Sequence, residues 1–237
     1  EQVMKDRADY ARKGIARGRS LVGLTCDLGI LVCAENTQRL RKVSYIHDRI
    51  AFAGVGKYNE FDQLRIAGVR HADLKGYAYS REDVDARSLA NQYAQILGQV
   101  FTHEMKPMEV EILVAEVGGR PGDDLMFRIL YDGTVIDEND VTVLGGDAEV
   151  ISQRLEDEWR PGLDLGGALA VARHALAGPD RTLGAGELEV ALLDRQAPRR
   201  AFRRIEGAEL EALLAADPGP PAPVDAADEP SGDAPAG

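Results

Sequence analysis

The sequence is poor in aromatic residues and cysteine, and it lacks any long uninterrupted apolar run. Aromatic residues make up 5% of the 237 residues, and there are two cysteines, Cys26 and Cys33. Because no run of about 18 apolar residues occurs, we expect no transmembrane helix and no membrane partner. Two cysteines in one strand–turn–strand segment are too few for a disulfide framework or a metal site. We therefore interpret them as buried thiols in a reducing cytoplasm.

Basic residues are also fewer than acidic ones: the sequence has 28 Lys and Arg and 40 Asp and Glu, which gives a formal net charge of −12. Nucleic acid repels a chain of this sign, so a nucleic-acid-binding module working through the cations of residues 1–20 is the least favoured class. The first residues lack the apolar stretch of a signal peptide, which favours a cytoplasmic location. The chain does not begin with Met, which indicates a trimmed or truncated N-terminus.

The common motifs of metal, nucleotide and serine-hydrolase chemistry are missing as well. The four histidines are scattered without acidic or cysteine partners at ligand spacing, so we expect no metal site. The segment "AGVGKYNE", residues 53–60, lacks the upstream Gly and the Ser or Thr after Lys57 that a phosphate-binding loop needs. No Gly-x-Ser-x-Gly elbow occurs. The sequence thus predicts no cofactor.

What is present is a regular succession of helix and strand patterns. Apolar spacing predicts helices at 3–16, at about 57–72, from Ser80 with Asp83 as a capping box, around Ile151–Trp159, after the cap Asp164, and at 207–215. Alternation and turn signals predict strands at "SLVGLTC", "ILVCAE", "KVSYIHD", "RIAFAG", "EVEILVAEV", "LMFRILY", "TVID", "VTVL", "LEVALL" and "RAFRRI". The Asp132-Gly133 pair is a strong hairpin turn.

This order contains more strands than a simple βαβ alternation would give. It favours an α+β fold in which two antiparallel sheets stack and helices pack on both outer faces. We assign residues 1–215 to one domain that begins with an N-terminal helix at 1–17. Residues 216–237 carry Pro, Ala, Gly and acids but no base, and we predict a disordered, dispensable tail.

Several segments together resemble the α-subunits of proteasome core particles, most closely the actinobacterial type. They are "DYARKGIARGRSLVGL", "RKVSYIHDRIAFAGVGKYNEFDQLR", "YAYSREDVDARSLANQYAQ" and "EVEILVAEV", and the likeness covers about residues 1–205. The resemblance implies the four-layer αββα sandwich of N-terminal nucleophile hydrolases, with seven copies in a ring. It also implies neighbouring α-subunits, catalytic β-subunits, a hexameric proteasomal ATPase and unfolded proteins as partners.

The resemblance further implies that this chain lacks a nucleophile. Catalytic relatives expose a Thr directly after a processed Gly, so that its free amine serves as base to its own hydroxyl. Here Gly18 keeps the place of that Gly, but Arg19 follows it, and Ser20 stands one position too late on the opposite face of the strand. We therefore interpret Ser20 as a strand residue.

The remaining positions of that catalytic constellation are only partly retained. Glu35 and Lys42 match the acid and the base of catalytic subunits. Gly146, Arg181 and Gly184 stand roughly where those subunits carry Ser, Asp and Ser. The implied function is a non-catalytic α-ring subunit that gates substrate entry and docks ATPase activators for degradation of Pup-tagged and other proteins. The alternative is an active N-terminal nucleophile peptidase or amidohydrolase of the same fold.

By the same resemblance, Lys42 receives the C-terminal carboxylate of a docked activator in a pocket between neighbours. Arg12 and the Gly54-Val55-Gly56 turn are expected to line that region, while Asp9 and Tyr10 are expected at the subunit interface and the gate. Two plainer interpretations stay open. Lys42 could be a solvated strand lysine paired with Glu35, and Tyr10 could simply pack its own helix on the sheet.

Overall fold

The computed structural model describes residues 1–219. Most of the predicted tail, residues 220–237, lies outside the described residues. Within 1–219 the helices are α1 Gln2–Ala16, α2 Tyr58–Ala78, α3 Ala86–His103, α4 Ala148–Glu158, α5 Leu165–Ala177 and α6 Gly207–Ala215. The strands are β1 Leu21–Cys26, β2 Gly29–Glu35, β3 Val43–His47, β4 Ile50–Gly56, β5 Val110–Glu116, β6 Leu125–Ile129, β7 Val135–Glu138, β8 Val141–Leu144, β9 Leu188–Asp194 and β10 Phe202–Ile205.

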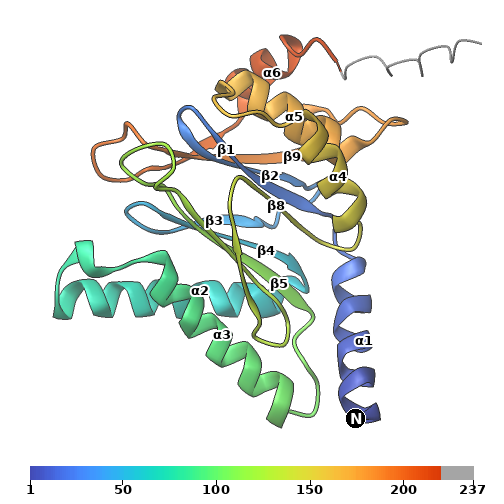
Figure 1. Cartoon of the computed structure of the whole chain (residues 1–237), viewed down its shortest axis with the longest axis vertical. Coiled ribbons are helices and arrows are strands. Elements are labelled where there is room, and N and C mark those ends of the chain that lie inside the picture. Colours follow the sequence, from blue (N-terminus) through green and yellow to red (C-terminus); the bar gives the residue numbers. More distant parts are fainter. Residues whose placement is uncertain (220–237) are drawn as a thin grey trace, which may run out of the picture.

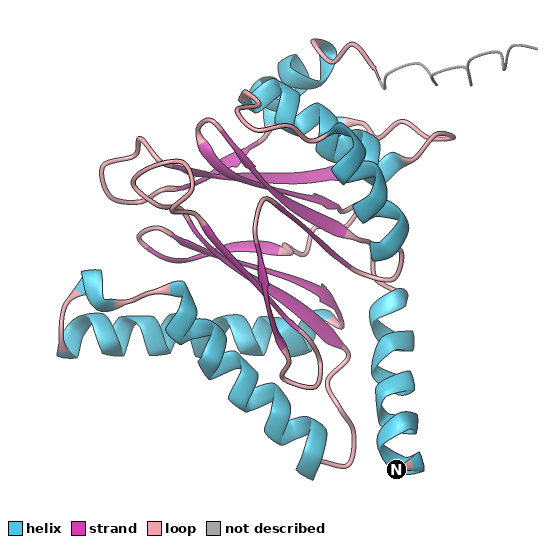
Figure 2. Cartoon of the chain, viewed as in Figure 1, coloured by secondary structure: helices cyan, strands magenta, loops and turns pink. Residues whose placement is uncertain are grey.

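These strands form two antiparallel five-stranded sheets stacked face to face. One sheet has the order β10-β9-β2-β1-β8 and the other the order β3-β4-β5-β6-β7. Helices α4 and α5 cover the outer face of the first sheet, and α2 and α3 cover the outer face of the second (Figures 1 and 2). Between the sheets lies a third apolar layer. The predicted four-layer αββα sandwich is therefore confirmed.

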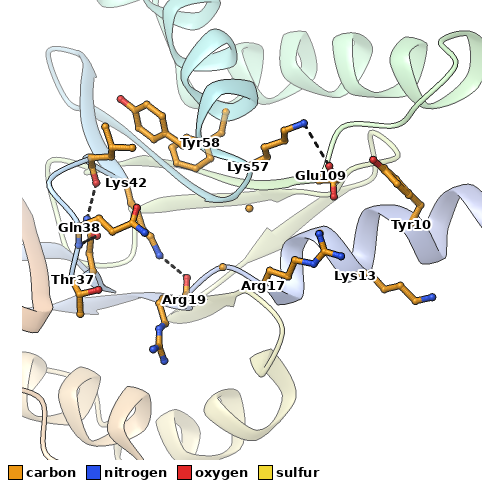
Figure 3. A pocket seen from close by; sticks show the side chains of 16 residues that line it. Tyr10, Lys13, Arg17, Arg19, Thr37, Gln38, Lys42, Lys57, Tyr58 and Glu109 are labelled. Carbon is orange, nitrogen blue, oxygen red and sulfur yellow. Dashed lines mark hydrogen bonds and ion pairs between the residues drawn. The ribbon is translucent and has the colours of Figure 1, made fainter.

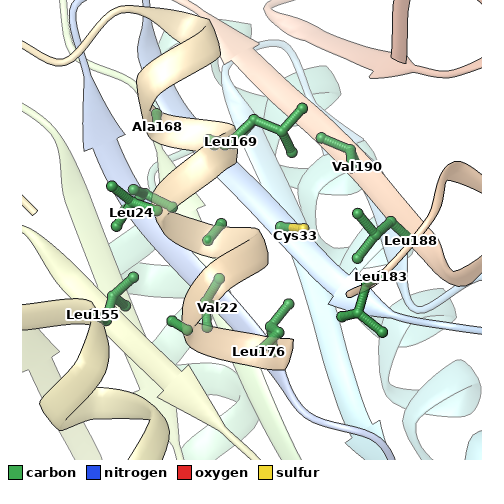
Figure 4. Packing of buried hydrophobic residues seen from close by; sticks show 14 of the residues in the cluster. Val22, Leu24, Cys33, Leu155, Ala168, Leu169, Leu176, Leu183, Leu188 and Val190 are labelled. Carbon is green, nitrogen blue, oxygen red and sulfur yellow. The ribbon is translucent and has the colours of Figure 1, made fainter. Parts of the chain in front are cut away.

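The layers follow from strands that are apolar on both faces. In β2 every residue from Gly29 to Glu35 is buried, so Leu31 and Cys33 meet the helices while Ile30 and Val32 meet the opposite sheet. Figure 4 shows Cys33 beneath α5. Burial raises the pKa of the Cys33 thiol to about 12, which leaves it protonated and unreactive. Both cysteines are free and buried, as predicted.

Two helix boundaries differ from the prediction. Ser80 caps only a short 3-10 turn, Arg81–Asp83, by accepting the amide of Glu82 at 3.3 Å. The buried, extended Val84 then breaks the helical path. Helix α3 starts afresh after Asp85, whose carboxylate accepts the Ser88 amide at 2.8 Å. Helix α2 also runs on to Ala78, beyond the predicted end at residue 72.

Helix α1 stands at the open end of the sandwich and leads directly into β1 (Figure 1). Ala11 and Ile15 are buried in the layer between the sheets, whereas Met4 is 44% exposed. Arg7 fixes the first half of α1, because its guanidinium donates to the carbonyls of Val100 and Phe101 at the C-terminal end of α3. The helix is therefore held by both sheets and by α3.

The structure also differs at the start of the predicted tail, because Asp217 belongs to the folded part. Its buried carboxylate lies 3.0 Å from both Arg173 Nη1 and His174 Nε2, and it accepts the Gly219 amide at 2.9 Å. Burial alone raises the pKa of Asp217, but Gly219, His174 and Arg173 outweigh it and hold that pKa below its ordinary value. These contacts hold the end of α6 on α5.

We expect Asp217→Ala to lower the free energy of unfolding by about 2–3 kcal/mol at pH 7, because Arg173 and His174 lose a buried partner. The folded pKa lies below the ordinary aspartate value of about 4, so this stabilisation is present above that value. It disappears as the pH falls through the folded pKa. Urea unfolding at pH 7 and pH 3 measures the difference, with the exposed Asp180→Ala as control. A variant as stable as the wild type at pH 7 would make the contact incidental.

Candidate functional site

A pocket of about 730 Å³ opens where three segments meet (Figure 3). They are the C-terminal end of α1, the loop 36–42 between β2 and β3, and the junction of β4 with α2. Gly56 ends β4 there with a φ of 111°, a backbone conformation that favours glycine. A side chain at that position would also meet the Glu109 carbonyl. The glycine thus lets the chain turn sharply from the sheet into α2 at the pocket wall.

Lys42 lies in this pocket with its ammonium group turned toward the start of β1. Its Nζ donates to the Arg19 carbonyl at 2.7 Å and to the Glu35 carbonyl at 3.1 Å. An ammonium has three donors, so within the described residues one of them is left for a ligand. Burial lowers the pKa of Lys42 to about 8, although the negative charges of Glu189 and Glu35 oppose that shift. Lys42 therefore stays largely charged at neutral pH.

The pocket wall carries more positive than negative charge. The cationic lining residues are Lys13, Arg17, Arg19, Lys42 and Lys57, and the anionic lining residue is Glu109. Glu109 Oε2 lies 3.9 Å from Lys57 Nζ, and Arg19 Nη1 lies 3.2 Å from the Glu35 carboxylate, so these charges are partly matched. The surplus positive charge then comes from Lys13, Arg17 and Lys42. A concave site with surplus fixed cations and a free ammonium donor fits an anionic group such as a carboxylate.

The predicted remnant of the catalytic constellation comes together behind Lys42. The buried Glu35 carboxylate accepts two hydrogen bonds from Arg181, at 2.9 and 3.2 Å, and lies 3.2 Å from Arg19 Nη1. Burial raises the pKa of Glu35, but Arg181, Arg19 and Lys42 outweigh it, so the pKa falls below its ordinary value. Glu35 is therefore an ionised carboxylate engaged by two arginines, which is a poor general base.

Ser20 is buried directly before β1 rather than exposed at the pocket. It is 6% exposed, and its carbonyl accepts the Glu35 amide at 3.1 Å. Its hydroxyl packs against Gly145, where a side chain would collide with it. Gly146 packs instead on Ala16 of α1, and the Gly184 amide donates to the Glu187 carboxylate at 2.9 Å. These positions supply no hydroxyl or carboxylate beside Lys42.

The other predicted site residues are only partly brought together. Tyr10 lines the pocket and is 41% exposed, and the Gly54 amide donates to the Lys42 carbonyl at 3.0 Å. Gly54-Val55-Gly56 is the end of strand β4 rather than a separate turn. Arg12 lies outside the pocket of the single chain, where it pairs with half-exposed Asp9 at 3.5 Å. Its guanidinium stacks on the ring of Tyr131.

Sequence reasoning missed several residues that shape the site. Lys13, in the last turn of α1, and Arg17, its C-cap residue, line the pocket, whereas Arg12 does not. Lys57 and Asn36 also line it. The regular spacing of Lys13 and Arg17 could have indicated a shared helix face, whereas nothing local in the sequence distinguishes Asn36.

Two features of residues 1–219 concern membrane-spanning helices and metal sites. No helix within residues 1–219 combines the length and the apolar character that crossing a bilayer requires. In the same part of the chain, His, Cys, Asp and Glu side chains do not gather into groups of three or more that could hold a metal ion.

Comparison with known proteins identifies the family to which the chain belongs. The family model described as "Proteasome subunit" matches residues 15–192. The chain is 60% identical over 219 residues to the proteasome subunit alpha of Acidimicrobium ferrooxidans, covering 92% of this chain and 94% of that protein. It is 57% identical over 230 residues to the proteasome subunit alpha of Sanguibacter keddieii, covering 94% and 90% respectively. The chain thus belongs to the proteasome subunit family, among its α-type members.

Proposed function

We propose that seven copies of this α-type subunit form each outer ring of a bacterial proteasome core particle. In this proposal the ring flanks catalytic β-subunits and gates the entry of unfolded proteins. It also docks a hexameric ATPase activator for the degradation of Pup-tagged and other substrates in the cytoplasm. The observation that carries the proposal is the cationic pocket around Lys42, which suits the C-terminal carboxylate of a docked partner.

The proposal holds that the subunit has no catalytic residues of its own. Arg19 occupies the position after Gly18, and the Ser20 hydroxyl is packed against Gly145. Glu35 is tied to Arg181 and Arg19 and does not face a nucleophile. An acid and a lysine without an accessible hydroxyl or thiol cannot perform acyl transfer.

An exposed apolar group at the end of α2 supports contact with another subunit. Leu74, Tyr77 and Tyr79 are 70%, 93% and 78% exposed. Leu74 and Tyr77 lie three residues apart, about one turn of α2, and neighbouring exposed apolar side chains mark contact sites. We assign this group to the contact with β-subunits, on the helix layer opposite α4 and α5.

Native mass spectrometry of the purified chain, with and without β-subunits, tests the proposal. We expect a seven-membered ring alone or on mixing, and a larger complex when β-subunits are present. Only the mixture should cleave a fluorogenic peptide. Peptide turnover by the α-subunit alone that disappears in Ser20→Ala would contradict the non-catalytic role and favour the active peptidase or amidohydrolase.

A further inference from the structure

A buried carboxylate outside the pocket holds the backbone where the loop 36–42 passes into β3. Glu189, on β9, is 4% exposed and does not line the pocket. Its carboxylate accepts the backbone amides of Lys42 at 2.9 Å and Val43 at 3.1 Å. Arg204 of β10 donates to the same carboxylate at 3.1 Å. A buried carboxylate with this many donors has little freedom to move, and neither has the backbone it holds.

Asn36 extends this network along the loop 36–42. Its Nδ2 donates to the Glu189 carboxylate and to the Leu40 carbonyl, both at 2.8 Å. Its Oδ1 accepts the Gln38 amide at 3.0 Å. Because Gln38 and Leu40 line the pocket, the two side chains together fix one pocket wall.

We propose that Glu189 is a positioning residue for the docking pocket, which fixes the backbone of Lys42 and thereby directs its ammonium group toward an incoming carboxylate. This inference rests on the proposed function, because it assumes that Lys42 receives a C-terminal carboxylate. It assigns a role to a residue that no ligand would touch.

The proposal also has an electrostatic half, which follows from the groups that face Lys42. Burial lowers the pKa of Lys42 to about 8, and Glu189 is the first of the two carboxylates that oppose this shift, ahead of Glu35. Arg19 acts in the opposite direction and lowers the pKa of Lys42 further. Other charged groups lining the same pocket are Lys13, Arg17, Lys57 and Glu109. Removing the charge of Glu189 therefore lowers the pKa of Lys42 further.

The sign of the pH dependence is fixed by the ligand. A carboxylate binds the ammonium form of Lys42, so affinity declines as the pH rises through the pKa of that lysine. In Glu189→Gln the decline should begin at a lower pH than in the wild type. A residue that merely stabilised the sheet would lower affinity equally at every pH.

The experiment uses assembled α–β barrels and the C-terminal heptapeptide of the hexameric proteasomal ATPase, with a free carboxylate or a C-terminal amide. Affinity is measured by surface plasmon resonance from pH 6 to pH 9. For Glu189→Gln we expect about a tenfold loss of affinity at pH 8 and a smaller loss at pH 6. The midpoint of the pH dependence, which is the pH at which half of the affinity is lost, should move to a lower pH. The amide peptide should bind weakly to all variants.

Glu116→Gln is the matched control, because Glu116 is also a partly buried glutamate whose carboxylate accepts a backbone amide, that of Ala86 at 2.7 Å. Glu116 lies outside the pocket, so we expect Glu116→Gln barrels to bind the peptide with wild-type affinity and a wild-type midpoint of the pH dependence. If Glu189→Gln does not assemble, Asn36→Ala tests the positioning half at a residue that also lines the pocket. It loosens the loop without removing a charge, so affinity should fall with the midpoint unchanged.

The outcomes separate this inference from the proposed function. Loss of binding in Lys42→Ala together with a wild-type affinity and midpoint in Glu189→Gln would overturn the role of Glu189 alone. If Asn36→Ala is used in place of Glu189→Gln, wild-type affinity of the Asn36→Ala barrels for the peptide would likewise overturn the positioning role of Glu189. Undiminished binding in Lys42→Ala would instead overturn the proposed function, and the role of Glu189 with it.

Discussion

Barrels that carry Lys42→Ala are expected to lose activator-stimulated degradation while keeping their fold and ring. The side chain makes its hydrogen bonds to two backbone carbonyls at the pocket wall, and it contributes nothing to the apolar layers. A charge-assisted contact of this kind is typically worth about 1.5–3 kcal/mol, or about a ten- to hundredfold change in affinity. Under the proposed function a hexameric activator engages several pockets at once, so we expect the loss to be multiplied.

The measurement is the ratio of degradation with and without the ATPase, together with activator affinity by surface plasmon resonance on assembled barrels. Lys106→Ala serves as the matched control, because Lys106 is an exposed lysine outside the pocket. Wild-type activator should also bind less tightly above pH 8, where Lys42 loses its proton. Unchanged affinity in Lys42→Ala would return this residue to the plainer interpretation of a strand lysine.

That plainer interpretation is already modified by the structure. Lys42 does not pair with the Glu35 carboxylate, which Arg181 and Arg19 engage, but donates to the Glu35 carbonyl. The sequence placed the right residues near one another, because β2 and the segment before β3 are close along the chain. It could not show which atoms meet, because Arg181 enters from a segment 146 residues away from Glu35.

The fold was predictable because its signals are local. Strands apolar on both faces and the Asp132-Gly133 turn, where Gly133 has a φ of 88°, predict strands and hairpins from a few residues at a time. A predicted helix boundary was wrong where two local signals competed. Ser80 and Asp83 match a capping box, yet Asp85 caps α3 because Val84 is drawn into the core. Burial of one side chain therefore overrode the local pattern.

The candidate site was predictable only in part, because long-range contacts build it. Glu189 reads as one more position in an apolar strand, and its partners Lys42 and Asn36 are about 150 residues distant. Arg12 lies outside the pocket of the single chain for a different reason. Neighbouring residues on a helix point about 100° apart, so Lys13 lines the pocket while Arg12 turns toward Tyr131. Its assignment to activator binding stays a prediction for the assembled ring.

Deleting residues 1–17 is expected to prevent ring formation. Asp9 and Tyr10 lie on the accessible side of α1, where a neighbouring subunit could meet them, while Ala11 and Ile15 fill the layer between the sheets. The deletion therefore removes the proposed contact and also opens the core. Loss of the buried Ile15 side chain alone should cost about 2–4 kcal/mol of folding free energy. The remaining chain should be soluble but less stable than the full chain.

A double variant, Asp9→Ala with Tyr10→Ala, separates assembly from stability, because both side chains are 41–46% exposed. Its unfolding should stay close to that of the wild type while native mass spectrometry shows monomers in place of rings. Tyr77→Ala is the reciprocal control: the exposed group on α2 should matter for β-subunits and leave the α-ring intact. A seven-membered ring that persists in the double variant and in the deletion would remove α1 from the interface. Tyr10 would then serve only to pack its own helix beside the pocket.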